Sequence, residues 1–197
     1  MNEKPILFST PMVRVLLNTK PGVWPAEPID DSKPYKSQTR RIPRGYDKAV
    51  TWCEDMSNIC PPEIGVIQSL KDIFIENCLY NPGDVLWVRE TWTKKVTQGF
   101  TYRADLDDPD YPTMWWKPSI HMPREAARIF LEVKSVRVER LQGLTESDSK
   151  QEGFVPNSDG LCGRAAFCKL WESLNAKRGY PWEDNPYVWV IEFMRKK

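Results

Sequence analysis

The spacing of apolar residues along the chain predicts three helices. Residues 10–19 and 164–177 each place apolar side chains three or four positions apart, which is typical of a helix that buries one face. A third, shorter helix begins after Thr145, with Asp148 three positions later as in a capping box, and ends at Gly153. The two amphipathic faces consist of Met12, Val15 and Leu16 in the first helix and of Phe167, Leu170, Trp171 and Leu174 in the second.

Extended, partly alternating runs of apolar residues predict strands between these helices. Residues 38–42, 100–104 and 188–194 have this character. The turn sequence NPGD at residues 81–84 precedes a run from Val85 that is largely apolar on both faces. An apolar run of this length between turn signals predicts a buried strand.

The longest strand signal, over residues 128–141, changes phase in its middle. Apolar side chains occupy odd positions up to Val133 and even positions from Val136, so the shift falls at Lys134 and Ser135. Such a one-residue shift predicts a β-bulge, which bends a strand where a barrel turns a corner. Because few helix-length linkers join adjacent strands, the pattern favours an α+β fold with a mainly antiparallel sheet or small β-barrel over a doubly wound parallel sheet.

The chain is long enough for one domain with its own hydrophobic core, at 197 residues. We therefore expect a single domain over residues 1–197, with flanking helices and three insertions. Residues 20–35 are rich in proline, and residues 46–80 have mixed periodicity broken by two adjacent prolines. Residues 99–117 contain an acidic turn followed by two adjacent tryptophans.

Charge and cysteine content narrow the class of protein. Lys and Arg total 28 against 27 Asp and Glu, so any nucleic-acid binding must come from a local patch rather than from overall charge. None of the five cysteines forms a C-x-x-C pair and there is one histidine, so we expect free thiols, no metal and no cofactor. No apolar run reaches about 20 residues and no signal peptide is recognisable, which predicts a soluble cytoplasmic protein that does not contact a membrane.

The densest chemical signal is the motif KSQTRR at residues 36–41. In an extended strand Thr39 and Arg41 point to one face and Arg40 points to the other. Lys36 joins Thr39 if the chain turns just before the strand. One interpretation is a solvated edge strand whose charges prevent aggregation. The other is a lysine and a hydroxyl placed beside a substrate, with arginines held for a phosphate or carboxylate group.

The order of the motifs resembles that of the ASCH domain, a family of PUA-like β-barrels. The resemblance rests on an early apolar helix, KSQTRR at residues 36–41, PGDVLWVRE at residues 82–90, and a long strand followed by the helix at residues 145–153. Three further motifs resemble the longer, often phage- or prophage-encoded members: WVRETW at residues 87–92, KPSIHMPR at residues 117–124 and KRGY at residues 177–180.

This resemblance implies a PUA-like domain that binds RNA or modified nucleobases. A compact bacterial branch of the family hydrolyses N4-acetylcytidine with a lysine, a threonine and a glutamate, and these roles would fall on Lys36, Thr39 and Glu152. The three residue types suit amide hydrolysis, because a desolvated lysine can act as a base, a hydroxyl can attack the acyl carbon, and a carboxylate can orient the pair. The insertions, and Ser37 where a threonine is common, distinguish this chain from the compact members.

Other side chains are candidates for contacting a base or a phosphate. Two adjacent indoles precede Lys117, and because a strand turns neighbouring side chains to opposite faces, at most one of them is free to stack on a base. Glu90 either belongs to an internal ion pair or accepts hydrogen bonds from a ligand, and His121 is either a structural histidine or a substrate contact. The candidate nucleic-acid or nucleoside contacts are Arg40, Arg41, Glu90, Trp92, Trp116, Lys117, His121 and Arg124.

Three functional hypotheses follow from the sequence. The leading one is a PUA-like pocket that binds a nucleoside, a modified nucleobase or a short single-stranded RNA, and that hydrolyses an N-acylated pyrimidine. The second is a non-catalytic nucleic-acid-binding module in which an indole stacks on a base and phosphates are held by Arg40, Arg41, Lys117 and Arg124. The third is a phage accessory protein that binds a host protein through its insertions, since tryptophan is enriched at interface hot spots. The pocket residues of the leading hypothesis are Lys36, Thr39, Arg41, Glu90 and Glu152.

Overall fold

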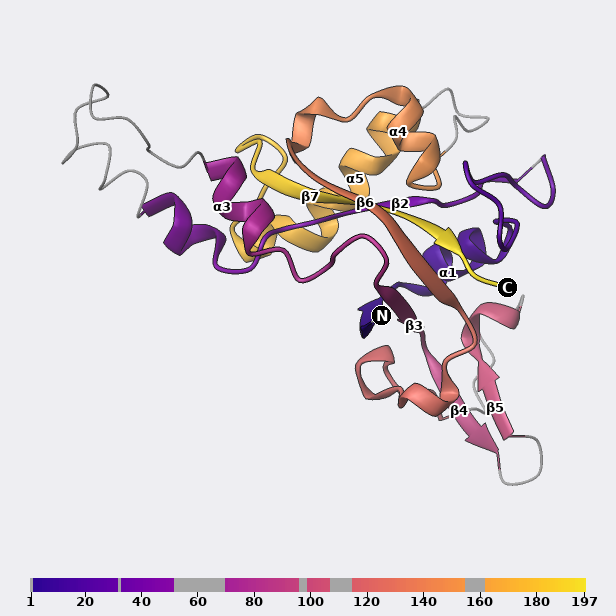
Figure 1. Cartoon of the computed structure of the whole chain (residues 1–197). Helices are drawn as coiled ribbons and strands as arrows, with labels where there is room; N and C mark the ends of the chain where they lie inside the picture. The colour runs from indigo at the N-terminus through magenta and orange to yellow at the C-terminus, as the bar shows by residue number, and fades with distance from the viewer. Residues whose placement is uncertain (1, 32, 52–69, 96–98, 107–114, 155–161) are drawn as a thin grey trace, which may run out of the picture.

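A mixed five-stranded sheet forms the centre of the protein, with the helices arranged around it (Figure 1). The computed structural model describes residues 2–31, 33–51, 70–95, 99–106, 115–154 and 162–197. The first strand of the sheet pairs in parallel with its neighbour and the other pairs are antiparallel. In spatial order the strands are β1 (Glu3–Leu7), β3 (Val85–Arg89), β6 (Phe130–Arg140), β7 (Tyr187–Arg195) and β2 (Gln38–Arg41).

Four helices with fully described bounds and a separate hairpin surround this sheet. In Figure 1 the helices α4 and α5 lie together above the sheet, and the hairpin projects away from it at the opposite end. The α+β class and the mainly antiparallel pairing predicted from the sequence are confirmed. The helices are α1 (Thr10–Leu17), α3 (Leu70–Glu76), α4 (Glu146–Gln151) and α5 (Gly163–Asn175), and the hairpin strands are β4 (Trp92–Lys95) and β5 (Gly99–Tyr102). Short 3₁₀ turns lie at Arg103–Asp105 (η1), Ser119–His121 (η2), Arg124–Ala126 (η3), Leu141–Gly143 (η4) and Ala176–Arg178 (η5).

The sheet curves so that its two edge strands, β1 and β2, approach each other. Among the described residues no backbone pairing closes it into a barrel. A side chain connects the edges instead, because Arg41 at the end of β2 donates from Nη2 to the carbonyl oxygen of Leu7 at the end of β1, at 3.0 Å. The edge strands therefore meet through an arginine rather than through a ladder.

The predicted bulge in the long strand is confirmed. The pairing of β6 with β7 changes register between Val133 and Ser135, at the position where the sequence pattern changes phase. Val133 is fully buried in the main core before the shift, and Val136 packs against the same core after it. The extra residue allows both halves of a bent strand to bury their apolar side chains.

The main core lies between this sheet and α1. Strand β3 is buried along almost its whole length, as its two-sided apolar pattern predicts. Trp189 on β7 is buried and donates from Nε1 to the carbonyl oxygen of Phe74 on α3, at 2.7 Å. The predicted insertion at residues 46–80 is thus fixed to the sheet through α3, and its residues 52–69 lie outside the described part of the chain.

The proline-rich segment at residues 20–35 is folded back against the end of α1. The side-chain amide of Asn18 donates to three carbonyl oxygens between Asp30 and Pro34. The hydroxyl of Thr19 accepts from the backbone N–H of Lys36 at 3.0 Å and donates to its carbonyl at 3.1 Å. These bonds fix the backbone of Lys36 immediately before β2 begins.

Helix α4 begins and ends as predicted. Thr145 and Asp148 form a capping box, in which the hydroxyl accepts from the Asp148 backbone N–H and the carboxylate accepts from that of Thr145. Glu152 is the C-terminal cap, and Gly153 follows it with a φ of +94°. A side chain at Gly153 would place its Cβ 2.7 Å from Cγ1 of Val15 on α1, so this position needs glycine for both its dihedral angle and its space.

Of the helices in the described residues, none is long and apolar enough to cross a membrane.

Replacing Gly153 by alanine is expected to lower the free energy of unfolding by about 3 kcal/mol, through a left-handed backbone and a clash with Val15. The matched control is Gly179→Ala, where φ is +87° but the added Cβ meets nothing within 4 Å. That control is expected to cost only the backbone term, about 1–2 kcal/mol. Urea denaturation of both variants measures the difference, and equal losses would contradict the packing explanation.

Candidate functional site

A cavity of about 520 Å³ opens beside the edge strand β2, between the end of β1, the C-terminal end of α4 and the helix α5. Its walls are partly aromatic, with Phe8 from the β1–α1 connection and Phe167 and Trp171 from α5. The rings of Phe167 and Trp171 stack with centroids 6.1 Å apart. The polar side chains that reach the cavity are Lys36, Thr39, Arg40, Arg41, Glu152 and Arg178, together with Ser9, Ser119 and Asn175.

A buried ion pair joins Lys36 to Glu152. The Nζ atom of Lys36 donates to Oε2 of Glu152 at 2.7 Å and to the carbonyl oxygen of the same residue at 2.8 Å. Both residues are only 2% exposed. The lysine comes from the turn before β2 and the glutamate from the cap of α4, so the pair connects two segments 116 residues apart in the chain.

Burial lowers the pKa of the Lys36 amine, because removal from water disfavours the charged form by more than the carboxylate of Glu152 favours it. Arg40 and Arg41 act in the same direction, since each adds positive charge nearby. A lysine with a lowered pKa supplies neutral amine at lower pH than an exposed lysine does, which is a requirement for a general base.

Thr39 and Arg41 point to the same face of β2, as the period of a strand requires. Arg41 donates from Nη1 to the hydroxyl oxygen of Thr39 at 2.8 Å, and also to the backbone carbonyl of Arg40 at 3.0 Å. The hydroxyl proton of Thr39 is not used in the bond from Arg41. A guanidinium that donates to this oxygen stabilises negative charge on it, which favours nucleophilic attack by the hydroxyl.

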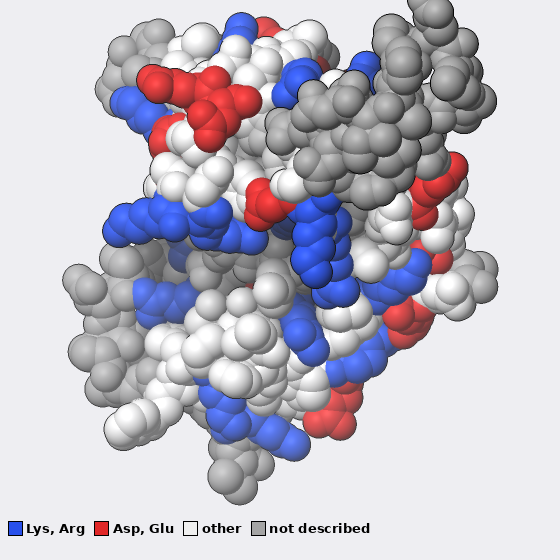
Figure 2. Space-filling view, turned by 90° about the vertical axis from the view of Figure 1, so that its left-hand side faces the viewer, with Lys and Arg blue, Asp and Glu red and all other residues white. Residues whose placement is uncertain are grey.

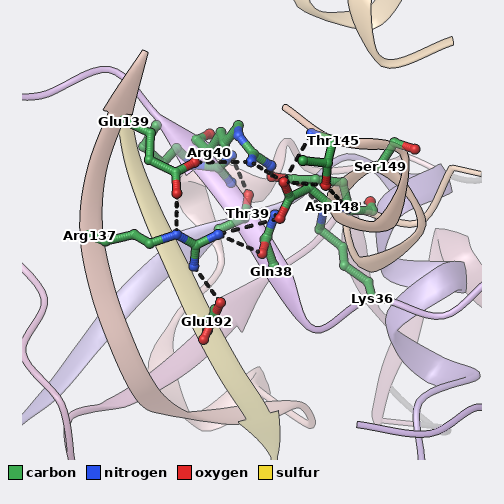
Figure 3. Close-up of polar contacts among 12 residues, drawn as sticks. Lys36, Gln38, Thr39, Arg40, Arg137, Glu139, Thr145, Asp148, Ser149 and Glu192 are labelled. Carbon is green, nitrogen blue, oxygen red and sulfur yellow. Dashed lines mark hydrogen bonds and ion pairs between the residues drawn. The ribbon is translucent and has the colours of Figure 1, made fainter. Parts of the chain in front are cut away.

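Arg40 connects the cavity to a charged network on the sheet (Figure 3). Its Nη1 donates to Oε1 of Glu152 at 3.2 Å, and its Nη2 lies 3.5 Å from carboxylate oxygens of both Asp148 and Glu139. Arg137 extends the network by pairing with Glu139 at 2.5 Å and with Glu192. The Nε of Arg40 is buried without a hydrogen-bond partner among the described residues.

These contacts decide between the two interpretations of the KSQTRR motif. Strand β2 is an edge strand, as the protective interpretation requires. However, Lys36, Thr39 and Arg40 are each no more than 3% exposed, so they do not form a solvated face. Arg137 and Glu139 on β6 are half-buried members of the same network.

Glu90 lies outside this cavity, contrary to the pocket predicted from the sequence. It is 1% exposed and accepts two hydrogen bonds from Arg128, at 2.8 and 2.9 Å. Burial raises the pKa of Glu90, and the hydrogen bonds and charge of Arg128 oppose that shift. Glu90 therefore belongs to an internal ion pair, and its partner is Arg128.

The aromatic candidates are also placed differently from the prediction. Trp92 is 5% exposed in a small core at the base of the hairpin, so its ring is not available to stack on a base. Trp116 is half-buried beneath the guanidinium of Arg103, whereas its neighbour Trp115 is 92% exposed. One of the two adjacent indoles is free, but it is Trp115 rather than Trp116, and neither residue lies in a strand.

The remaining candidates lie on the surface and do not line the cavity. Lys117 places its ammonium 5.0 Å from the ring centroid of Trp92, and His121 is exposed in η2. Arg124 forms two hydrogen bonds with Glu3, at 2.7 and 2.9 Å. The sequence did not identify Phe167, Trp171 or Arg178 as cavity residues. Phe167 and Trp171 fit the buried face of an amphipathic helix, and Arg178 resembles an ordinary charged residue at a helix end.

Within the described residues no three His, Cys, Asp or Glu side chains come together as a metal site requires. Comparisons of the chain with protein-family models, curated proteins and solved structures gave no match.

The lowered pKa of Lys36 predicts a dependence of stability on pH. Between that pKa and the ordinary value of 10.5, the unfolded chain binds more protons than the folded chain, so the free energy of unfolding rises with pH in this window. Urea denaturation between pH 6 and 10.5 is expected to show a more positive slope of the free energy of unfolding against pH for the wild type than for Lys36→Met, because the other titrating groups are common to both proteins. An identical pH profile in the two proteins would contradict the assignment.

Proposed function

We propose that the cavity binds a nucleoside or modified nucleobase, free or within single-stranded RNA, and hydrolyses an N-acylated pyrimidine such as N4-acetylcytidine. The observation that carries the proposal is the convergence of Lys36, Thr39 and Glu152 on one cavity. These are the three residues to which the resemblance to the ASCH domain assigns catalysis, and the glutamate is far from the other two in sequence. The curved sheet and the bulge in β6 are compatible with the PUA-like barrel that the same resemblance implies.

The cavity suits a nucleobase in size and in lining. Its volume of about 520 Å³ lies within the range of small-molecule sites. The rings of Phe8, Phe167 and Trp171 offer flat apolar surface against which a base can stack, which is a common mode of base recognition. The three proposed catalytic side chains lie on the side formed by β2, the turn before it and the end of α4, so a ligand would be oriented with its acyl group toward them.

The proposed chemistry uses the groups at this polar side in two steps. The neutral amine of Lys36 accepts the hydroxyl proton of Thr39 while the hydroxyl oxygen attacks the acyl carbon, and Arg41 stabilises the charge on that oxygen. The bond from the acyl carbon to the exocyclic nitrogen then breaks, and the ammonium of Lys36 returns the proton to the departing amine. Water hydrolyses the threonine ester and releases the carboxylic acid. Glu152 holds the amine of Lys36 in place throughout.

The non-catalytic nucleic-acid module has less support from the geometry. Two of the cations that it requires at the surface are engaged, since the side chain of Arg40 is 0% exposed and Arg124 is paired with Glu3. Phosphate binding by surface cations would make affinity fall steeply with salt. The proposed pocket binds a neutral nucleoside largely through its walls, so its affinity for cytidine is expected to change little with salt.

Mass spectrometry of N4-acetylcytidine incubated with the protein is expected to show cytidine and acetate. Thr39→Val, which keeps the shape but removes the hydroxyl, is expected to abolish turnover, whereas Thr39→Ser should retain it. Lys36→Met is expected to lower kcat by about 10²–10⁴-fold, the usual contribution of a general base. Thermal denaturation of each variant separates loss of chemistry from loss of folding.

Normal turnover by folded Lys36→Met or Thr39→Val would refute the catalytic assignment. If the wild type is stabilised by the nucleoside without turnover, the pocket is a binding site and the three residues only recognise the ligand.

A further inference from the structure

The charges around the cavity do not balance. Four of the side chains that line it are basic, three of them guanidinium groups, and one is a carboxylate. Lys36 is paired with that carboxylate, and Arg40 is shared between it and the acidic groups of the sheet network. The other two cations, Arg41 and Arg178, have no carboxylate within ion-pair distance among the described residues.

Arg41 is held entirely by neutral acceptors. Its guanidinium donates to the Thr39 hydroxyl, to the carbonyl of Arg40 and to the carbonyl of Leu7, and it lies over the ring of Phe8 at 5.2 Å. These contacts fix the group without an ion pair, and the carboxylate of Glu152 stabilises its charge only from beyond ion-pair distance. A half-buried guanidinium held in this way is prepared to bind an anion, because an uncompensated charge away from bulk water is costly.

Arg178 is held in a similar manner at the mouth of the cavity. It donates from Nη1 to the side-chain oxygen of Asn175 at 3.1 Å, and Asn175 itself is buried and lines the cavity. The amide thus orients an exposed guanidinium toward the opening while leaving its charge intact. The space-filling view shows Lys and Arg side chains around a hollow in the middle of the face that carries α3 (Figure 2).

We infer that the ligand of this cavity carries a phosphate group beside its nucleoside, bound by Arg41 within the cavity and by Arg178 at its mouth. The inference rests on the proposed function and narrows its substrate class from nucleosides to nucleotides. A phosphate monoester carries close to two negative charges at neutral pH, which matches the two uncompensated guanidinium groups. Arginine also binds phosphate oxygens through paired hydrogen bonds, so the fit is geometric as well as electrostatic.

The test compares the affinities of cytidine, cytidine 5′-monophosphate and the dinucleotide CpC, measured by isothermal titration calorimetry at constant salt. We expect the wild type to bind at least one of the phosphorylated ligands about tenfold or more tightly than cytidine. Tighter binding of the monophosphate identifies a free nucleotide as the ligand, and tighter binding of CpC identifies an RNA strand.

Arg178→Ala is expected to remove this preference, so that the variant binds its phosphorylated ligand no more than about twofold tighter than it binds cytidine. Lys177→Ala, the matched control, removes a neighbouring exposed cation that does not line the cavity and should keep the full preference. Equal affinity of the wild type for all three ligands would overturn the phosphate site while leaving the nucleoside pocket standing. Absence of binding by any of them would overturn both, and a preference that Arg178→Ala leaves intact would overturn the role of Arg178.

Discussion

The ion pair between Lys36 and Glu152 is the constraint on which the rest of the site depends. Removing two such charges from water costs several kcal/mol for each ion, and the cost is offset only if the pair has good geometry and further hydrogen bonds. The surrounding elements supply both. Thr19 fixes the backbone of the lysine, and the capping box of α4 places the glutamate at the end of the helix. The close approach of Gly153 to α1 then holds that helix end against the rest of the fold.

The curvature of the sheet explains why the cavity lies at the edge of the sheet rather than over its middle. A bulge bends β6, the sheet curves, and the ends of β1 and β2 come near each other without joining through their backbones. Arg41 spans the gap by donating to Leu7, and it also donates to the hydroxyl of Thr39. One guanidinium therefore contributes to the fold, to the proposed nucleophile and to the positive charge of the cavity. Its three neutral acceptors leave that charge available to a ligand.

Sequence patterns predicted most of the local structure, because it follows from periodicity and from caps. The phase shift before Val136 located the bulge, and Thr145 and Gly153 located both ends of α4. The motif around Lys36 and its resemblance to the ASCH domain identified three side chains that do converge. Patterns could not show which charged groups become partners, so Glu90 was expected in the cavity although Arg128 holds it elsewhere. Nor could they show which of two adjacent indoles is exposed, since that depends on how a loop meets the β4–β5 hairpin.

The proposed chemistry requires Lys36 to be a buried amine with a lowered pKa. Side-chain NMR of ¹⁵N-labelled lysines tests it most directly, with Lys36→Arg used to assign the signal. We expect the Lys36 signal to titrate below the ordinary value of 10.5 and to shift when N4-acetylcytidine is added. A Lys36 signal that titrates at the ordinary value and does not respond to saturating ligand would contradict the account.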